Sequence, residues 1–212
     1  MNDNINHRMK IIIIGEAGVG KTCILKQFVD NEFNECEKAT ASLSCATKNL
    51  TIDDEKIKLE VWDTVGQESY RAMAEIFFKN SNAAILTYDI TKLESFQQLT
   101  TYWFTKIKEY KDNELILVVA ANKSDLYLKE QVPEQDGRDS AEKIGAIFKL
   151  TSAKNGEGIK DLFETIAKIY LEKLNKKSSS SSPDKPKNIV LKKNNNEYNN
   201  SAIIKEKKNC KC

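Results

Sequence analysis

The sequence is poor in the residue type on which many hydrolases depend. Among its 212 residues there is a single histidine, His7. Catalysis by a serine or cysteine nucleophile usually needs a histidine base close by, and zinc-type metal sites usually need imidazole ligands. We therefore expect neither histidine-dependent nucleophilic catalysis nor a histidine-ligated metal.

Long apolar runs and a cysteine framework are also lacking. No apolar run approaches the roughly 18 residues of a membrane-spanning helix, and residues 1–8 are polar, without the apolar core of a secretion signal. Of the five cysteines, Cys23, Cys36 and Cys45 are scattered without metal-type spacing. The sequence predicts a reducing compartment and no disulfide framework.

The charge is unevenly divided along the chain. With 40% hydrophobic and 30% charged residues, the composition fits one globular domain with an extension. Residues 175–212 hold ten lysines against three acidic residues, about +7, which leaves the rest at about −5. This serine-, asparagine- and lysine-rich stretch cannot bury enough apolar area to order itself. We expect a flexible start at 1–8, a globular domain at 9–174 and a disordered basic tail at 175–212.

Apolar runs of strand length alternate with segments of helical period. The predicted strands are 10–14, 83–88, 115–121 and 146–150, and the predicted helices are 21–29, 94–110 and 158–174. Residues 43–52 and 56–62 flank Asp53 and Asp54 and indicate a hairpin. The pattern predicts an α/β fold, a mostly parallel sheet with one antiparallel edge strand. Functional loops are expected at the carboxyl ends of its strands.

A phosphate-binding loop follows the first predicted strand. The residues 15–22, GEAGVGKT, fit the pattern G-x-x-x-x-G-K-[ST] and open a helical segment. In such a loop, inward-facing backbone N–H groups surround phosphate, Lys21 reaches the β and γ oxygens, and the Thr22 hydroxyl can ligate Mg²⁺. The predicted phosphate-binding residues are Glu16, Ala17, Gly18, Val19, Gly20, Lys21, Thr22 and Cys23.

The residues that bind the base decide which nucleotide is bound, because a phosphate loop alone would also fit an ATPase or a nucleoside monophosphate kinase. NKSD at 122–125 and TSAK at 151–154 each follow a strand and resemble the guanine-recognition motifs of small GTPases. A carboxylate at Asp125 can accept from both N1–H and the 2-amino group of guanine. The resemblance implies that Lys123 lies along the base and that Ala153 N–H meets O6. The predicted base-binding residues are Asn122, Lys123, Asp125, Ser152, Ala153 and Lys154.

A third motif, DTVGQ at 63–67, follows the strand 56–62. Its resemblance to small GTPases implies that Asp63 holds Mg²⁺ through a water, with Thr22 and Thr40 completing the metal shell. It also implies that Gly66 N–H meets the γ-phosphate and that Gln67 orients the attacking water, so Gln67 and Lys21 are the predicted catalytic residues. No arginine precedes Thr40 in its loop, so slow intrinsic turnover, accelerated by a partner, is expected.

Within small GTPases the chain resembles the Rab family. The resemblance rests on KLEVWDT at 58–64, SYRAM at 69–73 and YDIT at 88–91, and covers about 10–174. It implies a P-loop small GTPase fold with six strands and helices on both faces. It also implies a monomeric GTP/GDP switch with Mg²⁺ that regulates vesicle traffic. The implied partners are an exchange factor, a GTPase-activating protein, a prenyl-dependent extraction chaperone, and effectors that contact the surface of 41–45, Trp62 and Phe77.

The final residues, CKC at 210–212, resemble the double-cysteine ends on which Rab proteins carry geranylgeranyl groups. A C-a-a-X box would need cysteine where Asn209 stands. Lipidation of Cys210 and Cys212, with the basic tail, would anchor the protein to the cytoplasmic face of intracellular membranes, with a cytosolic pool. The segment 28–33 and the Asp53-Asp54 hairpin look most like those of endosomal Rabs.

Departures from the Rab pattern leave alternatives open. Residues 41–45 lack the usual Ile-Gly-aromatic sequence, and Cys45 replaces an aromatic that partners commonly read. Val65 stands in an alanine position, and with Ala17 it motivates an alternative, a hydrolysis-impaired GTP-bound module on membranes.

Two further classes fit the sequence less well. A nucleoside kinase would need lid arginines, yet the chain has only Arg8, Arg71 and Arg138. Nucleic-acid binding through the tail lacks interleaved aromatic residues, and no nucleic-acid partner is expected.

Overall fold

The computed structural model describes residues 5–35, 37, 40, 43–64, 78–110 and 114–180. Several expectations fall outside the described residues: those on Val65, Gly66, Gln67 and Phe77, on 41–42, and on Cys210 and Cys212. No helix within the described ranges is long and apolar enough to cross a bilayer.

A six-stranded sheet forms the centre of the domain, in the order β2-β3-β1-β4-β5-β6. Only β2 and β3 pair antiparallel, and the other neighbours are parallel. This confirms the predicted mostly parallel sheet with one antiparallel edge strand. The strands are β1 (His7–Ile14), β2 (Ser44–Ile52), β3 (Glu55–Asp63), β4 (Ala83–Asp89), β5 (Ile116–Asn122) and β6 (Ile147–Thr151).

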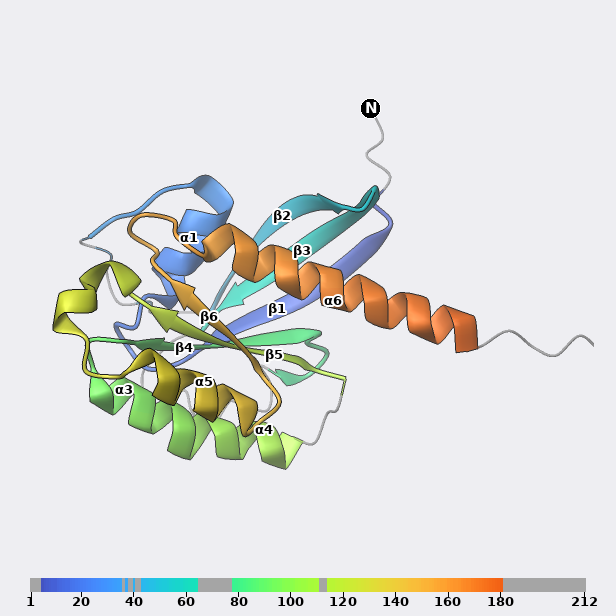
Figure 1. Cartoon of the computed structure of the whole chain (residues 1–212). Coiled ribbons are helices and arrows are strands. Elements are labelled where there is room, and N and C mark those ends of the chain that lie inside the picture. Colours follow the sequence, from blue (N-terminus) through green and yellow to red (C-terminus); the bar gives the residue numbers. More distant parts are fainter. Residues whose placement is uncertain are drawn as a thin grey trace, which may run out of the picture. The chain divides into compact units, whose positions relative to one another are not determined.

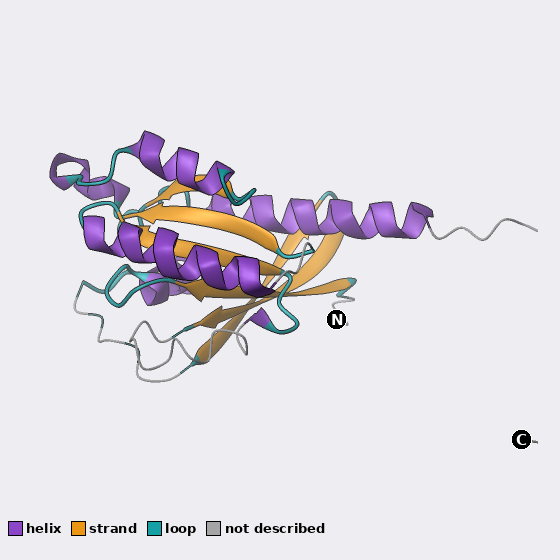
Figure 2. Ribbon diagram, turned by 90° about the horizontal axis from the view of Figure 1, so that it is seen from below, coloured by secondary structure: helices purple, strands orange, loops and turns teal. Residues whose placement is uncertain are grey.

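Helices cover both faces of this sheet, as predicted (Figure 1). Helices α1 (Lys21–Asp30) and α6 (Ile159–Ser180) pack on one face, where Phe28 stacks on Phe163 with ring centroids 3.7 Å apart. The other face carries a helix made of α3 (Leu93–Gln98), the π-helical turn η2 (Leu99–Trp103) and α4 (Phe104–Tyr110), together with α5 (Glu134–Glu142). Figure 2 shows the sheet between these two layers.

The burial of each strand follows its place in the sheet. The central strand β4 is buried along its whole length, and Ile11, Ile12, Ile13 and Ile14 of β1 are at most 1% exposed. On β3, next to the edge, only alternate residues are buried. Strands covered on both faces are expected to be apolar runs, whereas strands nearer the edge alternate.

Two boundaries differ from expectation. The sequence predicts that His7 and Arg8 belong to a flexible start, but they are the first two residues of β1. They pair with Ile57 and Lys58, because β3 extends far enough to hydrogen-bond with them. Helix α6 was expected to end at 174 but continues to Ser180. Glu114 contacts this end of the helix twice. Lys173 donates to the Glu114 carbonyl, and Lys177, in the additional turns, pairs with the Glu114 carboxylate, each at 2.9 Å.

Helix α5 and the 3-10 helix η3 (Ser124–Lys129) were not predicted. The buried face of α5 consists of small residues, Gly137, Ser140 and Ala141, which give no apolar periodicity to find. The predicted hairpin is present, and both residues of its turn, Asp53 and Asp54, have positive φ. A two-residue hairpin turn with this twist needs residues that tolerate the left-handed region, as aspartate does.

Candidate functional site

A pocket of about 460 Å³ opens where the loops after β1, β5 and β6 meet the loop after α1. It therefore lies at the carboxyl ends of the strands, as expected for an open parallel sheet. Twelve of the predicted site residues line it: Ala17, Gly18, Gly20, Lys21, Thr22, Cys23, Thr40, Asn122, Lys123, Asp125, Ala153 and Lys154.

The predicted phosphate end is organised by Lys21, the first residue of α1. Its side chain is 6% exposed, and its ammonium donates to the carbonyls of Gly15 at 2.9 Å and Glu16 at 2.8 Å. Burial lowers the pKa of Lys21 to about 8, although the negative charges of Asp63 and Glu16 oppose the shift. The lysine is thus fixed across the loop, with its ammonium close to the backbone that precedes the helix.

Three oxygen-bearing side chains meet beside this lysine. Thr22 donates to Asp63 Oδ2 at 2.6 Å, and its hydroxyl lies 2.6 Å from that of Thr40, which is 3.3 Å from the same carboxylate oxygen. Asp63 is fully buried, and its Oδ1 has no hydrogen-bond partner among the described residues. Burial raises the pKa of Asp63, opposed by its hydrogen bonds and by Lys21.

This cluster fits a hard cation. A set made only of oxygen donors suits Mg²⁺, and a buried carboxylate with an orphaned oxygen is an incomplete environment without a cation near it. The described part of the chain contains no group of three His, Cys, Asp or Glu side chains suited to a metal. The oxygens that lie beside the Asp63 carboxylate are the hydroxyls of Thr22 and Thr40.

Asn122 ties three loops together at the centre of the site. It is 1% exposed, and its amide donates to the carbonyl of Val19 at 2.8 Å. Its Oδ1 accepts from Thr151 Oγ1 at 3.3 Å and from Ala153 N–H at 3.2 Å. That N–H was expected to meet guanine O6, so in this structure it holds Asn122 instead.

The close approach of Asn122 explains a glycine of the phosphate loop. Gly20 has φ +97°, and a Cβ built on it would lie 2.4 Å from Asn122 Nδ2. Any side chain at this position would push the two loops apart and would also strain the backbone.

Lys123 spans from the base end of the pocket to the phosphate loop. Its ammonium donates to the carbonyl of Gly18 at 2.9 Å and pairs with Asp89 Oδ2 at 2.6 Å. Asp89 is fully buried, and its other oxygen accepts from the backbone and hydroxyl of Thr91 at 2.9 and 2.7 Å. The lysine stem is thus held extended along the pocket wall.

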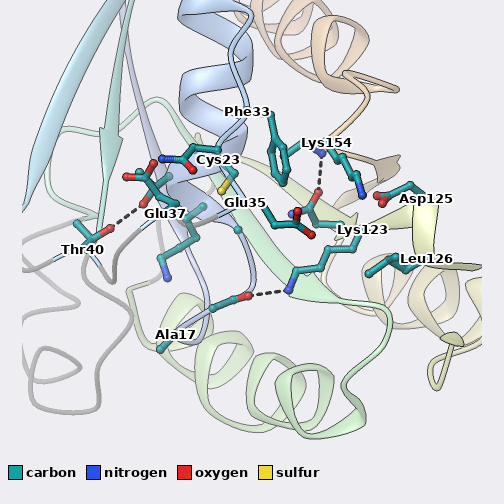
Figure 3. Close-up of a pocket in the computed structure, with 17 residues that line it drawn as sticks. Ala17, Cys23, Phe33, Glu35, Glu37, Thr40, Lys123, Asp125, Leu126 and Lys154 are labelled. Carbon is teal, nitrogen blue, oxygen red and sulfur yellow. Dashed lines mark hydrogen bonds between the residues drawn. The ribbon is translucent and has the colours of Figure 1, made fainter.

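Asp125 is oriented from behind by Ser152. The serine hydroxyl donates to Asp125 Oδ1 at 2.6 Å and also accepts from Asn155 N–H at 3.3 Å. Ser152 is fully buried and does not line the pocket, so its part is to position the carboxylate. Figure 3 shows Phe33, Lys123, Asp125 and Lys154 at one end of the pocket and Thr40 at the other.

Sequence reasoning missed several residues of the pocket wall. They lie in the loop after α1 and in η3: Phe33, Asn34, Glu35, Glu37 and Leu126. Phe33 is 38% exposed and lies beside the base-binding end. Its position as an aromatic residue just after a helix was the only feature of the sequence that could have indicated a role in the pocket. Glu37 pairs with Lys26 of α1 at 2.7 Å, a contact that no spacing in the sequence reveals.

Some predicted residues lie apart from the pocket wall. Val19 belongs to the phosphate loop but is fully buried, and none of Val19, Glu16, Asp63 and Ser152 lines the pocket. On the predicted effector surface, Cys45 pairs with Trp62 across the β2–β3 ladder, and Leu43 is 43% exposed.

Comparison with known proteins agrees with this geometry. A family model described as the Ras family matches residues 10–172. The chain is 36% identical over 182 residues to Ras-related protein RABA2b of Arabidopsis thaliana, covering 84% of this chain and 85% of that protein. It is 34% identical over 174 residues to Ras-related protein RABA4b of the same plant, covering 82% and 77%. The chain therefore belongs to the Ras family and, within it, to the Rab proteins: it is a small GTPase of vesicle traffic.

Proposed function

We propose that this GTPase is a switch that binds GTP or GDP with Mg²⁺, hydrolyses GTP slowly, and binds effectors according to the nucleotide. One observation carries the proposal. A single pocket has the hydroxyls of Thr22 and Thr40 at one end, both hydrogen-bonded to the buried Asp63 behind them, and an oriented carboxylate, Asp125, at the other. A Mg²⁺-bound guanine nucleotide requires this arrangement, with oxygen ligands near its phosphates and a carboxylate near its base.

The base end discriminates by polar complementarity. The Asp125 carboxylate would accept from N1–H and the 2-amino group of guanine, whereas adenine would leave it unpaired, which is costly in a partly buried site. Ser152 and Asn122 fix the neighbouring groups. Phe33 and the stem of Lys123 would lie against the faces of the base.

The phosphate end would act by position and charge, since hydrolysis of this kind uses no protein nucleophile. Thr22, Thr40 and Asp63 would hold Mg²⁺, and the ion when bound neutralises charge on the phosphate oxygens. The ammonium of Lys21 and the inward N–H groups of residues 16–22 would stabilise the same charge from the protein side. Gln67 would orient the attacking water, and Gly66 N–H would contact the γ-phosphate.

The switch would follow from the contacts of Thr40. This threonine comes from the loop between α1 and β2, and its hydroxyl reaches Thr22 and Asp63. Loss of the γ-phosphate would weaken the attachment of this loop and of the segment after Asp63, so that hydrolysis changes the surface offered to effectors. Exchange factors and GTPase-activating proteins would set the rates.

A second candidate, a GTP-bound module with impaired hydrolysis, remains open. It is motivated by Val65 next to Gly66 and by Ala17, which lines the pocket. Both candidates bind guanine nucleotide, so a binding test addresses what they share.

The base-recognition proposal is tested with Asp125→Asn in the full chain. We expect its affinity for GDP with Mg²⁺ to fall about 100-fold or more, because two hydrogen bonds to a charged acceptor are lost. Equilibrium titration with fluorescent GDP measures this, with fluorescent ADP as the specificity control. Asp139→Asn, an exposed aspartate of α5, is the matched control. Equal affinity of the wild type for GDP and ADP would contradict the proposal.

A further inference from the structure

A second hollow, of about 550 Å³, lies between η3, α5 and the carboxyl ends of β4, β5 and β6. Its volume is within the range of small-molecule sites. Ile90 and Leu150 supply apolar wall. Among the residues of the nucleotide site, only Asp125 also lines this hollow. It is thus a separate site that borders the base-binding end.

Two buried hydroxyls in this second pocket, Tyr88 OH and Ser124 Oγ, have no hydrogen-bond partner among the residues that the structure describes. Tyr88 is 0% exposed. A buried hydroxyl without a partner costs free energy of about 1–3 kcal/mol. The ring of Tyr88 packs against Phe96, with centroids 5.0 Å apart, and a phenylalanine would provide that contact equally well. Core packing therefore leaves the hydroxyl unexplained.

Helix α5 has a glycine, Gly137, at the point where the Tyr88 hydroxyl approaches it. A Cβ on Gly137 would lie 2.4 Å from Tyr88 OH and 2.6 Å from the ring of Phe148. A glycine inside a helix lowers its stability by about 1 kcal/mol relative to alanine. The fold thus carries a glycine where both the Tyr88 hydroxyl and the Phe148 ring approach helix α5.

The second pocket is also strongly acidic. Glu130, Glu134 and Glu157 line it. Within the described ranges the carboxylates of Glu130 and Glu157 make no ion pair, whereas Glu134 pairs with Arg138. Burial raises the pKa of Tyr88, and the charges of Glu130, Glu134 and Asp136 raise it further, so the negative potential reaches the hydroxyl. A positively charged ligand is favoured there.

We propose that this second pocket binds a small organic cation with two or more ammonium groups, of the polyamine class. One ammonium would donate to Tyr88 OH and Ser124 Oγ, and another would lie between Glu130 and Glu157. A bare metal ion fits less well, since no three acidic side chains in the described structure form a metal cluster. A polyamine places its charges several ångströms apart, which suits carboxylates spread around a hollow.

Binding here would be linked to the nucleotide through Asp125, which lines both pockets. This linkage, unlike the binding itself, rests on the proposed guanine site. An ammonium near the Asp125 carboxylate would compete with the base for its charge, so we expect the cation to weaken GDP binding, and GDP to weaken cation binding by the same factor.

Binding is tested by calorimetric titration of spermidine into the full chain, loaded with GDP and Mg²⁺ in 150 mM salt. We expect one saturable site. Glu130→Gln and Glu157→Gln should each weaken binding about fivefold or more, and Tyr88→Phe about threefold or more. Glu142→Gln removes an exposed acid at the end of α5 and is the matched control. Unsaturable binding, or equal loss in Glu142→Gln, overturns the proposal in favour of a water-filled hollow on an acidic surface.

Two readouts show whether a variant loses spermidine affinity because it is misfolded or has lost its nucleotide. Tyr88→Phe should match or exceed the melting temperature of the wild type, because it keeps the ring and removes a buried hydroxyl that has no partner in the described structure. The bound GDP content, measured before each titration, tests the guanine site on its own, so its failure is distinct from a failure to bind spermidine. Spermidine should accelerate release of fluorescent GDP in the wild type and not in Glu130→Gln. An unchanged release rate in the wild type would overturn the linkage through Asp125.

Discussion

At the scale of single residues, the site is organised by side chains that hold other side chains. Asn122 bonds to both the phosphate loop and the loop after β6, and Ser152 holds Asp125. The motifs of the sequence were sufficient to find these residues. Their spacing did not reveal that Asn122 closes against Gly20, because that contact exists only once β1 and β5 are placed in one sheet.

Asp89 is another residue of this kind. Its fully buried carboxylate pairs with Lys123 at 2.6 Å. In the sequence it belongs to the family segment YDIT, which predicts no role for the aspartate. The partner of Lys123 lies on β4, 34 positions earlier in the chain, so only the fold brings the two together.

We expect Asp89→Asn to accelerate GDP dissociation about tenfold, because Lys123 would lose the charge that holds its ammonium beside the pocket. Stopped-flow displacement of fluorescent GDP measures the rate. Asp139→Asn, on the surface of α5, controls for loss of a negative charge. If both variants release GDP at the wild-type rate, Asp89 has no positioning role.

At the scale of elements, the apolar runs identified β1, β4, β5 and β6 to within a few residues, because buried parallel strands leave continuous hydrophobic sequence. The antiparallel strands β2 and β3 were identified instead by the hairpin around Asp53 and Asp54. The segment 94–110 was predicted as one helix, and it forms α3, η2 and α4 in succession. The π-helical turn coincides with Thr100 and Thr101, whose hydroxyls donate to main-chain carbonyls of Phe96 and Gln97. Helical periodicity alone gives no sign of such a local change.

The end of α1 is held by a neighbouring strand. Lys48 of β2 donates to the carbonyls of Phe28 and of Val29, the latter at 3.2 Å, and its ammonium lies 4.9 Å from the ring of Phe28. A cation at a helix C-terminus satisfies orphan carbonyls and complements the helix dipole. This contact positions the helix that begins with Lys21 and Thr22.

Replacement of Lys48 by methionine keeps most of the stem and removes the ammonium. We expect the free energy of unfolding to fall by about 1–2 kcal/mol, because the last carbonyls of α1 lose their donor. Urea denaturation followed by circular dichroism gives this value. Lys58→Met, on the adjacent strand β3, is the matched control. A loss of the same size in Lys58→Met would show that the effect is not specific to the helix end.

At the scale of the whole molecule, charge is divided between an acidic body and a basic tail. The sequence places about +7 in 175–212 and ends in the cysteine pair Cys210 and Cys212. We propose that two geranylgeranyl groups on these cysteines, with the lysines, anchor the protein to the cytoplasmic face of intracellular membranes, of endosomal type. Two lipid chains give stable binding where one is marginal.

The Cys210→Ser, Cys212→Ser double variant tests the anchor in eukaryotic cells. We expect it to remain in the soluble fraction, whereas the wild type divides between membrane and cytosol and gains the mass of two geranylgeranyl groups. Cys45→Ser controls for loss of a thiol elsewhere. Membrane binding of the double variant at the wild-type level would exclude these cysteines as the lipid sites.

The hydrolysis step decides between a switch and a GTP-locked module. In the proposed mechanism it would depend on Gln67, on Lys21 and on Val65 beside Gly66. Thr22, Thr40 and Asp63 would hold Mg²⁺ with the nucleotide. The most direct measurement is single-turnover phosphate release from GTP preloaded on the full chain, with Gln67→Leu and Val65→Ala alongside. We predict release at a rate on the order of 10⁻⁴ s⁻¹ that falls further in Gln67→Leu. Absence of release from the wild type, with release restored by Val65→Ala, would contradict the switch and establish the locked module.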